Sequence, residues 1–122
     1  MTWPALILVA SDATLRDAVK AVAEACSHAF SHFCSLSELI AAEPPRPGDI
    51  LMVDLTGWAD IATLLDWRNG LPSAPRTLVL TKHAPERLMR RVEPVEGVEV
   101  WRMPIEAARL VALLDASSSR RT

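Results

Sequence analysis

Uninterrupted apolar runs are the feature that most constrains how this chain can fold. They cover residues 5–10, 50–53 and 78–80. A strand with one wet face alternates apolar and polar residues, whereas a strand inside a parallel sheet is covered on both faces and is apolar throughout. The runs therefore predict buried strands of a parallel sheet. The first run is also too short to be a membrane span.

Segments in which apolar residues recur at helical spacing lie between the strands. The first of them follows Ser11 and Asp12, which are good helix N-cap residues, and has Leu15 and Val19 on one face. Five strand–helix units joined by short connections predict a doubly wound, flavodoxin-like α/β fold, with a five-stranded parallel sheet and helices on both faces. The expected order is strand 5–10, helix 13–25, strand 29–34, helix 36–40, strand 49–54, helix 58–68, strand 76–81, helix 85–92, strand 98–102 and helix 104–116.

Length and composition agree with one globular domain. The chain has 122 residues, of which 50% are hydrophobic and 23% are charged, and this is enough for a buried core. We expect the domain to cover residues 1–116 and the tail 117–122 to be disordered. A net charge of −2 gives no general attraction to nucleic acid. Two cysteines, Cys26 and Cys34, and no visible signal peptide or membrane span predict a cytoplasmic protein.

The functional crevice of an open parallel sheet lies at the carboxyl ends of its strands. Two of the expected strands end in a polar residue, Asp54 and Thr81, and the fifth is followed by Met103 and Pro104. This rule singles out the candidate crevice residues Ala10, Ser11, Asp12, Asp54, Thr81, Met103 and Pro104.

At these positions the chain resembles response-regulator receiver domains, the CheY-like modules of two-component signalling, over about residues 5–116. The resemblance implies that Asp54 occupies the phospho-acceptor position, that Thr81 is the hydroxyl residue at the end of the fourth strand, and that Pro104 belongs to the family's Lys-Pro pair. In that family acidic side chains hold Mg²⁺, and the metal and the lysine neutralise the phosphoryl group that the aspartate accepts.

The residues that should balance charge depart from the family pattern. Met103 stands at the lysine position and cannot neutralise an acyl phosphate. The family's acidic pair falls on Ala10 and Ser11 or, with a shift of one residue, on Ser11 and Asp12. At most a weak Mg²⁺ site formed by Asp12 and Asp54 is left, and we expect the protein to need no cofactor.

The aromatic residue of the family's switch is missing as well. Its position in the fifth strand is Val100, and the neighbouring Trp101 should face the other way because side chains alternate along a strand. The segment after Asp54 also lacks the family's usual loop signature. The phosphorylation switch is therefore predicted to have decayed.

The resulting hypothesis is a stand-alone, degenerate receiver, or pseudo-receiver, that acts in signal transduction through protein–protein binding. We expect it not to be phosphorylated and not to be an enzyme. Its expected partner is another signalling protein of a two-component pathway or phosphorelay, namely a histidine kinase, a phosphotransferase or an effector, and a homodimer stays open. Carried over from the family by position, the partner surface would consist of Arg87, Arg90, Arg91 and an exposed Trp101.

Two alternative functions stay open. One is a Mg²⁺-dependent response regulator that is phosphorylated on Asp54. The other is a flavodoxin-like domain that binds a small ligand at the same crevice, although the chain has only four glycines and no glycine-rich phosphate loop.

Cys26, His28, His32 and Cys34 form a cluster of metal-ligating residue types. On a helix, His28 and His32 would share a face at a spacing typical of zinc sites. On a strand they would lie about 13 Å apart, which is too far for one ion. Because we expect the end of a helix followed by a strand here, the cluster predicts no metal site.

Overall fold

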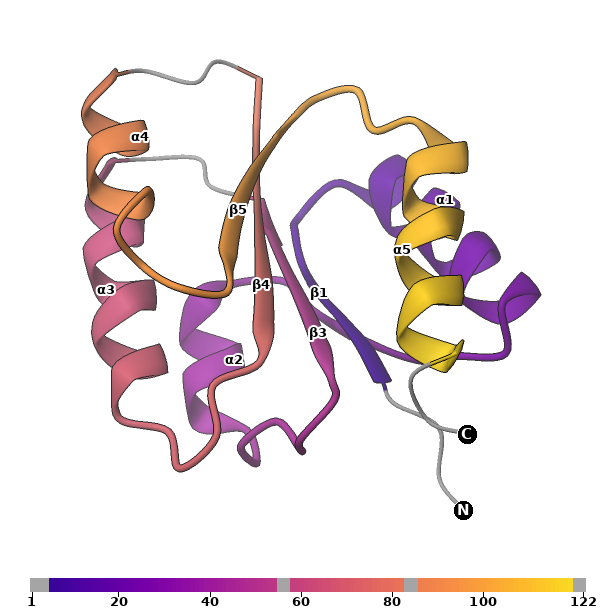
Figure 1. Ribbon diagram of the computed structural model, residues 1–122, viewed down its shortest axis with the longest axis horizontal. Helices are drawn as coiled ribbons and strands as arrows, with labels where there is room; N and C mark the ends of the chain where they lie inside the picture. The colour runs from indigo at the N-terminus through magenta and orange to yellow at the C-terminus, as the bar shows by residue number, and fades with distance from the viewer. Residues whose placement is uncertain (1–4, 55–57, 83–85, 120–122) are drawn as a thin grey trace.

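The computed structural model describes residues 5–54, 58–82 and 86–119. In these residues five strands alternate with five helices (Figure 1). None of the described helices is long and apolar enough to cross a membrane. The elements are β1 (Ala5–Val9), α1 (Ala13–Ala25), β2 (Ala29–Phe33), α2 (Leu36–Ala41), β3 (Ile50–Asp54), α3 (Trp58–Asn69), β4 (Arg76–Thr81), α4 (Glu86–Val92), β5 (Val98–Arg102) and α5 (Ala107–Ser119).

The last helix differs most from its expected position. It begins three residues later than expected, at Ala107, because the carbonyl of Glu106 accepts the amides of Arg109 and Leu110 at 3.1 and 3.2 Å and so opens the helix. It then continues to Ser119, into the segment expected to be a tail. Residues 120–122 of that tail, and Pro85 of the fourth expected helix, lie outside the described residues.

All five strands are parallel and form one sheet in the order β2-β1-β3-β4-β5. The predicted doubly wound fold is therefore confirmed. The strand order changes direction at β1, which pairs with β2 on one side and with β3 on the other. Such a switch point, at the carboxyl ends of the strands, is where open sheets of this kind place their sites.

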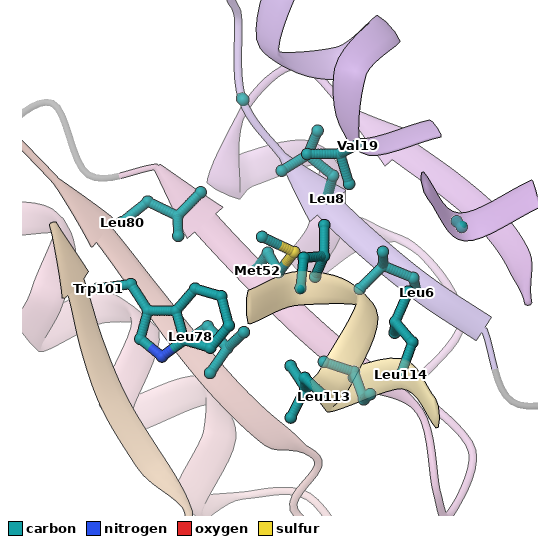
Figure 2. Close-up of a cluster of buried hydrophobic side chains, with 13 residues drawn as sticks. Leu6, Leu8, Val19, Met52, Leu78, Leu80, Trp101, Leu113 and Leu114 are labelled. Atoms are coloured by element: carbon teal, nitrogen blue, oxygen red, sulfur yellow. The ribbon is translucent and has the colours of Figure 1, made fainter. Parts of the chain in front are cut away.

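The helices cover both faces of the sheet, with α1 and α5 on one face and α2, α3 and α4 on the other (Figure 1). Side chains alternate between the faces, so that Leu6 and Leu8 of β1 point to α1 and α5, and Ile7 and Val9 point to the opposite side. Figure 2 shows the cluster on the first face, where Trp101 of β5 and Leu114 of α5 meet the leucines of β1 and β4. Burial on both faces explains why the strands are apolar throughout.

Two buried charged side chains hold together the amino ends of the strands, on the side of the sheet that lies opposite the crevice. Asp49, just before β3, accepts the amide of Ala5 at the start of β1 and the amide of Arg46, both at 2.9 Å. Arg68, near the end of α3, donates to the carbonyls of Pro75 and Glu96, before β4 and β5. These contacts hold the starts of the strands together and so set where the strands end.

Candidate functional site

Asp54 and Thr81 are the last residues of two neighbouring strands, β3 and β4, and lie at the carboxyl ends of the sheet. In the parallel register Asp54 pairs with Leu80, the residue just before Thr81. The carbonyl of Thr81 accepts the amide of Met103 at 2.8 Å, which extends the β4–β5 ladder beyond its last paired residues. The structure therefore brings Asp54, Thr81 and Met103 to the ends of three adjacent strands, as the sequence predicts.

Asp12 is the N-cap of α1. Its Oδ1 accepts the amides of Thr14 and Leu15 at 2.8 and 3.2 Å, and a carboxylate at a helix N-terminus is favoured by the helix dipole. The side chain is exposed, as is that of Ser11. One oxygen of the Asp12 carboxylate, Oδ1, is therefore used to start the helix.

Ala10 lies at the end of β1, where the first of the family's two acidic residues falls in one of the two alignments. It is buried in the hydrophobic cluster on the α1 and α5 face, and its amide donates to Phe33 at 3.0 Å. Its carbonyl accepts a hydrogen bond from Nε2 of His32 at 2.7 Å. The position is thus a packed and bonded part of the strand end, with no charged group.

Asp54 is half-buried, and its pKa is raised by this burial and, in second place, by repulsion from Asp12. Lys82 acts in the opposite direction and lowers the pKa of Asp54. Sequence reasoning missed Lys82, although it directly follows Thr81 at the end of β4. The crevice therefore holds a cation after β4, while the residue after β5 is Met103.

Met103 packs into the apolar layer between α1 and α5. It is half-buried against the hydrophobic cluster on that face, and so is Ile105. Together with Leu15 and Val22 it lines a small apolar groove between the two helices. The Met103–Pro104 peptide bond is cis, and Pro104 is exposed. The position that carries a lysine in the receiver family is therefore built into the hydrophobic packing.

The prediction that Trp101 is exposed is wrong. The side chain is only 3% exposed and belongs to the cluster that α5 covers. Its indole donates to Glu99 at 3.2 Å, and the guanidinium of Arg109 lies 4.1 Å from the ring centroid. Sequence alternation alone could not show that α5 would cover this ring. Val100 faces the opposite cluster, in agreement with the expected alternation.

The arginines of the expected partner surface are separated from Trp101 by the sheet. Arg87, Arg90 and Arg91 are exposed on α4, which covers the opposite face from α5, and Arg90 forms an ion pair with Glu86 one helical turn earlier. Met89, on the same helix, is 39% exposed. The candidate partner surface is therefore the exposed side of α4 without Trp101.

The Cys/His cluster is divided among separate structural roles. His28 is buried, and its Nε2 donates to the carbonyl of Leu114 in α5 at 3.1 Å, whereas His32 bonds Ala10. Burial and, next, Asp115 raise the pKa of the Cys26 thiol, which makes it a poor nucleophile. Within residues 5–54, 58–82 and 86–119, no group of three or more acidic, histidine or cysteine residues could hold a metal ion.

The described residues also fit Mg²⁺ poorly. The ion needs oxygen ligands and keeps several waters when a protein supplies only one or two carboxylates. Here the carboxylates at the crevice are Asp54 and Asp12, and Asp12 already binds two helix amides. The ammonium of Lys82 also acts on Asp54. Asp54 and Asp12 alone therefore make a poor Mg²⁺ site.

Comparison with known proteins identifies the fold. No protein-family model and no curated protein sequence matches the chain significantly. A bacterial signal-transduction switch described as transiently phosphorylated matches with 19% identity and a TM-score of 0.70 over 98% of each chain. The ShkA Rec1 structure, solved in complex with c-di-GMP, matches with 18% identity and a TM-score of 0.55 over 93% of this chain and 91% of that one.

A pilus assembly-related protein from Burkholderia pseudomallei K96243 matches with 18% identity and a TM-score of 0.65 over 98% of this chain and 92% of that one. These similarities cover nearly the whole chain and agree with the observed five-stranded parallel sheet. The chain therefore has the fold of the receiver, or CheY-like, domains.

Proposed function

We propose that this protein is a pseudo-receiver, which acts in signal transduction by binding another protein and is not phosphorylated on Asp54. The observation that carries the proposal is the packing of Met103 among apolar side chains of α1 and α5. Phosphoryl transfer to an aspartate needs positive charge around the developing phosphate. At the end of β5, where the receiver family has a lysine, this chain has the uncharged thioether of Met103.

The rest of the crevice supports the same proposal. Burial and the charge of Asp12 raise the pKa of Asp54, so the site disfavours added negative charge. Lys82 provides one compensating cation, but Ala10 provides no carboxylate for a metal. A phosphoryl group would bring further negative charge to a site that has lost the family's means of balancing it.

The exposed side of α4 is the proposed binding surface. Arg87, Arg90 and Arg91 give it positive charge, and Met89 adds an exposed apolar side chain. Arginine and methionine are enriched at protein interfaces. A signalling protein with an acidic surface, such as a histidine kinase, phosphotransferase or effector, is the partner that this chemistry fits, and a second copy of the chain is the other candidate.

The test of the first part is an amide NMR titration with Mg²⁺ and then with beryllofluoride, an aspartyl-phosphate mimic. We expect no shift changes at Asp54, Thr81 or β5 at millimolar Mg²⁺. Shift changes that begin at Asp54 and spread to β5 would show a working phospho-acceptor and would overturn the proposal.

The test of the second part is charge reversal on α4. The variant Arg87→Glu/Arg91→Glu should abolish binding to the cognate signalling protein, measured by titration with candidate kinases, phosphotransferases and effectors of the same cell. The matched control is Lys20→Glu, an exposed cation on α1 on the other face of the sheet. A partner that binds the α4 variant and the wild type equally would exclude this surface.

A second candidate function is recognition of a small ligand, and a specific observation favours it. A cavity of about 500 Å³ lies at the outer edge of β5, where the chain turns into α5, and it is lined by Arg102 and Arg109. Cavities of this size are typical of small-molecule sites. The structure of ShkA Rec1, which has the same fold, was solved with c-di-GMP. We infer that guanine nucleotides are the ligand class to test.

A further inference from the structure

A series of side-chain contacts leads from the start of β4 to the wall of the cavity beside β5. Arg76 pairs with Glu99 at 2.9 Å, and Glu99 accepts the indole N–H of Trp101 at 3.2 Å. The Arg109 guanidinium lies over the Trp101 ring, 4.1 Å from its centroid. The Arg109 guanidinium therefore rests, at the wall of the cavity, on a ring that Glu99 holds by its indole N–H.

Arg109 is exposed, although the ring beneath it is buried. Trp101 therefore covers one side of the Arg109 guanidinium, and both residues line the cavity. Planar guanidinium groups stack on aromatic faces, including those of nucleic acid bases. A base that enters the cavity would complete a sandwich with Arg109 in the middle.

Two other charged residues line the cavity, and their charges differ in sign. Glu106 lies just before α5, and Arg102 ends β5. A carboxylate accepts hydrogen bonds and donates none. Guanine presents two adjacent N–H donors on its Watson–Crick edge, whereas adenine presents an acceptor beside its amino group. Glu106 therefore matches guanine, and Arg102 matches a phosphate.

We propose that this cavity is a guanine nucleotide site, and this proposal rests on the second candidate function. The base stacks on Arg109, Glu106 accepts the N1–H and the amino group of guanine, and Arg102 binds the phosphate. The site is formed by β5 and the start of α5 and does not use Asp54.

The first experiment is calorimetric titration of the full chain with GMP, AMP, guanosine and orthophosphate. We expect GMP to bind more tightly than AMP by about tenfold or more, because guanine offers the Glu106 carboxylate two adjacent donors, whereas adenine offers one donor beside an acceptor. Equal binding of GMP and AMP, or of GMP and orthophosphate, would reduce the site to a general anion site and would overturn the guanine assignment.

Variants then test each role separately. Glu106→Gln should remove the preference for GMP over AMP, Arg102→Ala should weaken GMP but leave guanosine unchanged, and Arg109→Lys should weaken both. The amide NMR spectrum checks that each variant is folded. The control is Lys20→Ala on α1, an exposed cation that does not line the cavity, and it should change nothing. If GMP binds but these variants have no effect, the site lies elsewhere and the proposal is wrong, while the second candidate function stands. If neither GMP nor c-di-GMP binds, that candidate function fails as well.

Discussion

The guanidinium of Arg68 occupies the space that a side chain at position 97 would need. A β-carbon on Gly97 would lie 2.7 Å from Nη2 of Arg68, and Gly97 has a φ of +82°. The same guanidinium donates to the carbonyls of Pro75 and Glu96 at 3.1 Å. Arg68 and Gly97 therefore act as one unit, which joins the end of α3 to the segments that lead into β4 and β5.

Gly97→Ala should destabilise the fold by about 1–3 kcal/mol, because alanine is strained at positive φ and its methyl group displaces the arginine. Chemical denaturation monitored by circular dichroism measures the change. Gly70→Ala is the matched control, since a β-carbon there would meet nothing closer than the carbonyl oxygen of Trp67 at 3.5 Å. Equal losses in the two variants would contradict this explanation.

Arg68→Met should cost about 3 kcal/mol of unfolding free energy, since it leaves buried carbonyls without their charged donor. It also removes the group that a side chain at position 97 would meet. Gly97→Ala should therefore cost less in the Arg68→Met background than in the wild type. A double-mutant cycle measures this coupling, and strict additivity would show that the two residues are independent.

The charges around Asp54 predict how its carboxyl titrates. Asp12→Asn keeps the α1 cap but removes a repelling charge, so the pKa of Asp54 should fall. Lys82→Met removes an attracting charge, so the pKa of Asp54 should rise. Carboxyl ¹³C NMR titration of Asp54 measures both shifts. Shifts of the same sign in the two variants would contradict the assigned roles.

The same raised pKa predicts a stability change. The folded pKa of Asp54 lies above its ordinary value of 3.8, so its ionised form is disfavoured in the folded protein at neutral pH. Asp54→Asn should therefore stabilise the protein at pH 7. This gain should disappear as the pH falls through the raised folded value to about 3.8, because the wild-type carboxyl is then protonated in both states. A gain that does not change with pH would have another cause.

Glu99 should show the opposite pH dependence. Its hydrogen bond from Trp101 and, next, its contacts with Arg76 hold its pKa below the ordinary 4.5, although burial opposes this. Its contribution to stability is therefore present above 4.5 and is lost as the pH falls through the lower folded value. Wild type should be more stable than Glu99→Gln at pH 7, and this difference should shrink below pH 4.5. Added salt should also reduce the difference, because the ion pair is partly exposed to solvent.

The strands and the positions of the crevice residues could be predicted because their causes are local. A strand covered on both faces must be apolar throughout, and so residues 5–10 and 50–53 identified β1 and β3. Asp12 is the N-cap of α1, as its residue type predicts. Because the strands are parallel, Asp54 and Thr81 then lie together at the carboxyl ends of β3 and β4.

The charge balance of the crevice and the burial of Trp101 could not be predicted in this way. The action of Lys82 on Asp54 depends on how the chain leaves β4, which no periodic pattern records. Trp101 was expected at the surface because its position belongs to the partner surface of the receiver family, but α5 returns over its ring and Arg109 covers it. That contact joins residues of different elements and depends on where α5 begins.

The position of β1 between β2 and β3 has a consequence during synthesis. β1 leaves the ribosome before β3, and the contact between Ala5 and Asp49 that fixes this second neighbour spans 44 residues. Until β3 emerges, one edge of a wholly apolar strand has no partner, and such an edge is a template for pairing with other chains. The nascent chain should therefore recruit chaperones before β3 is complete, and a fragment that ends before β3 should aggregate.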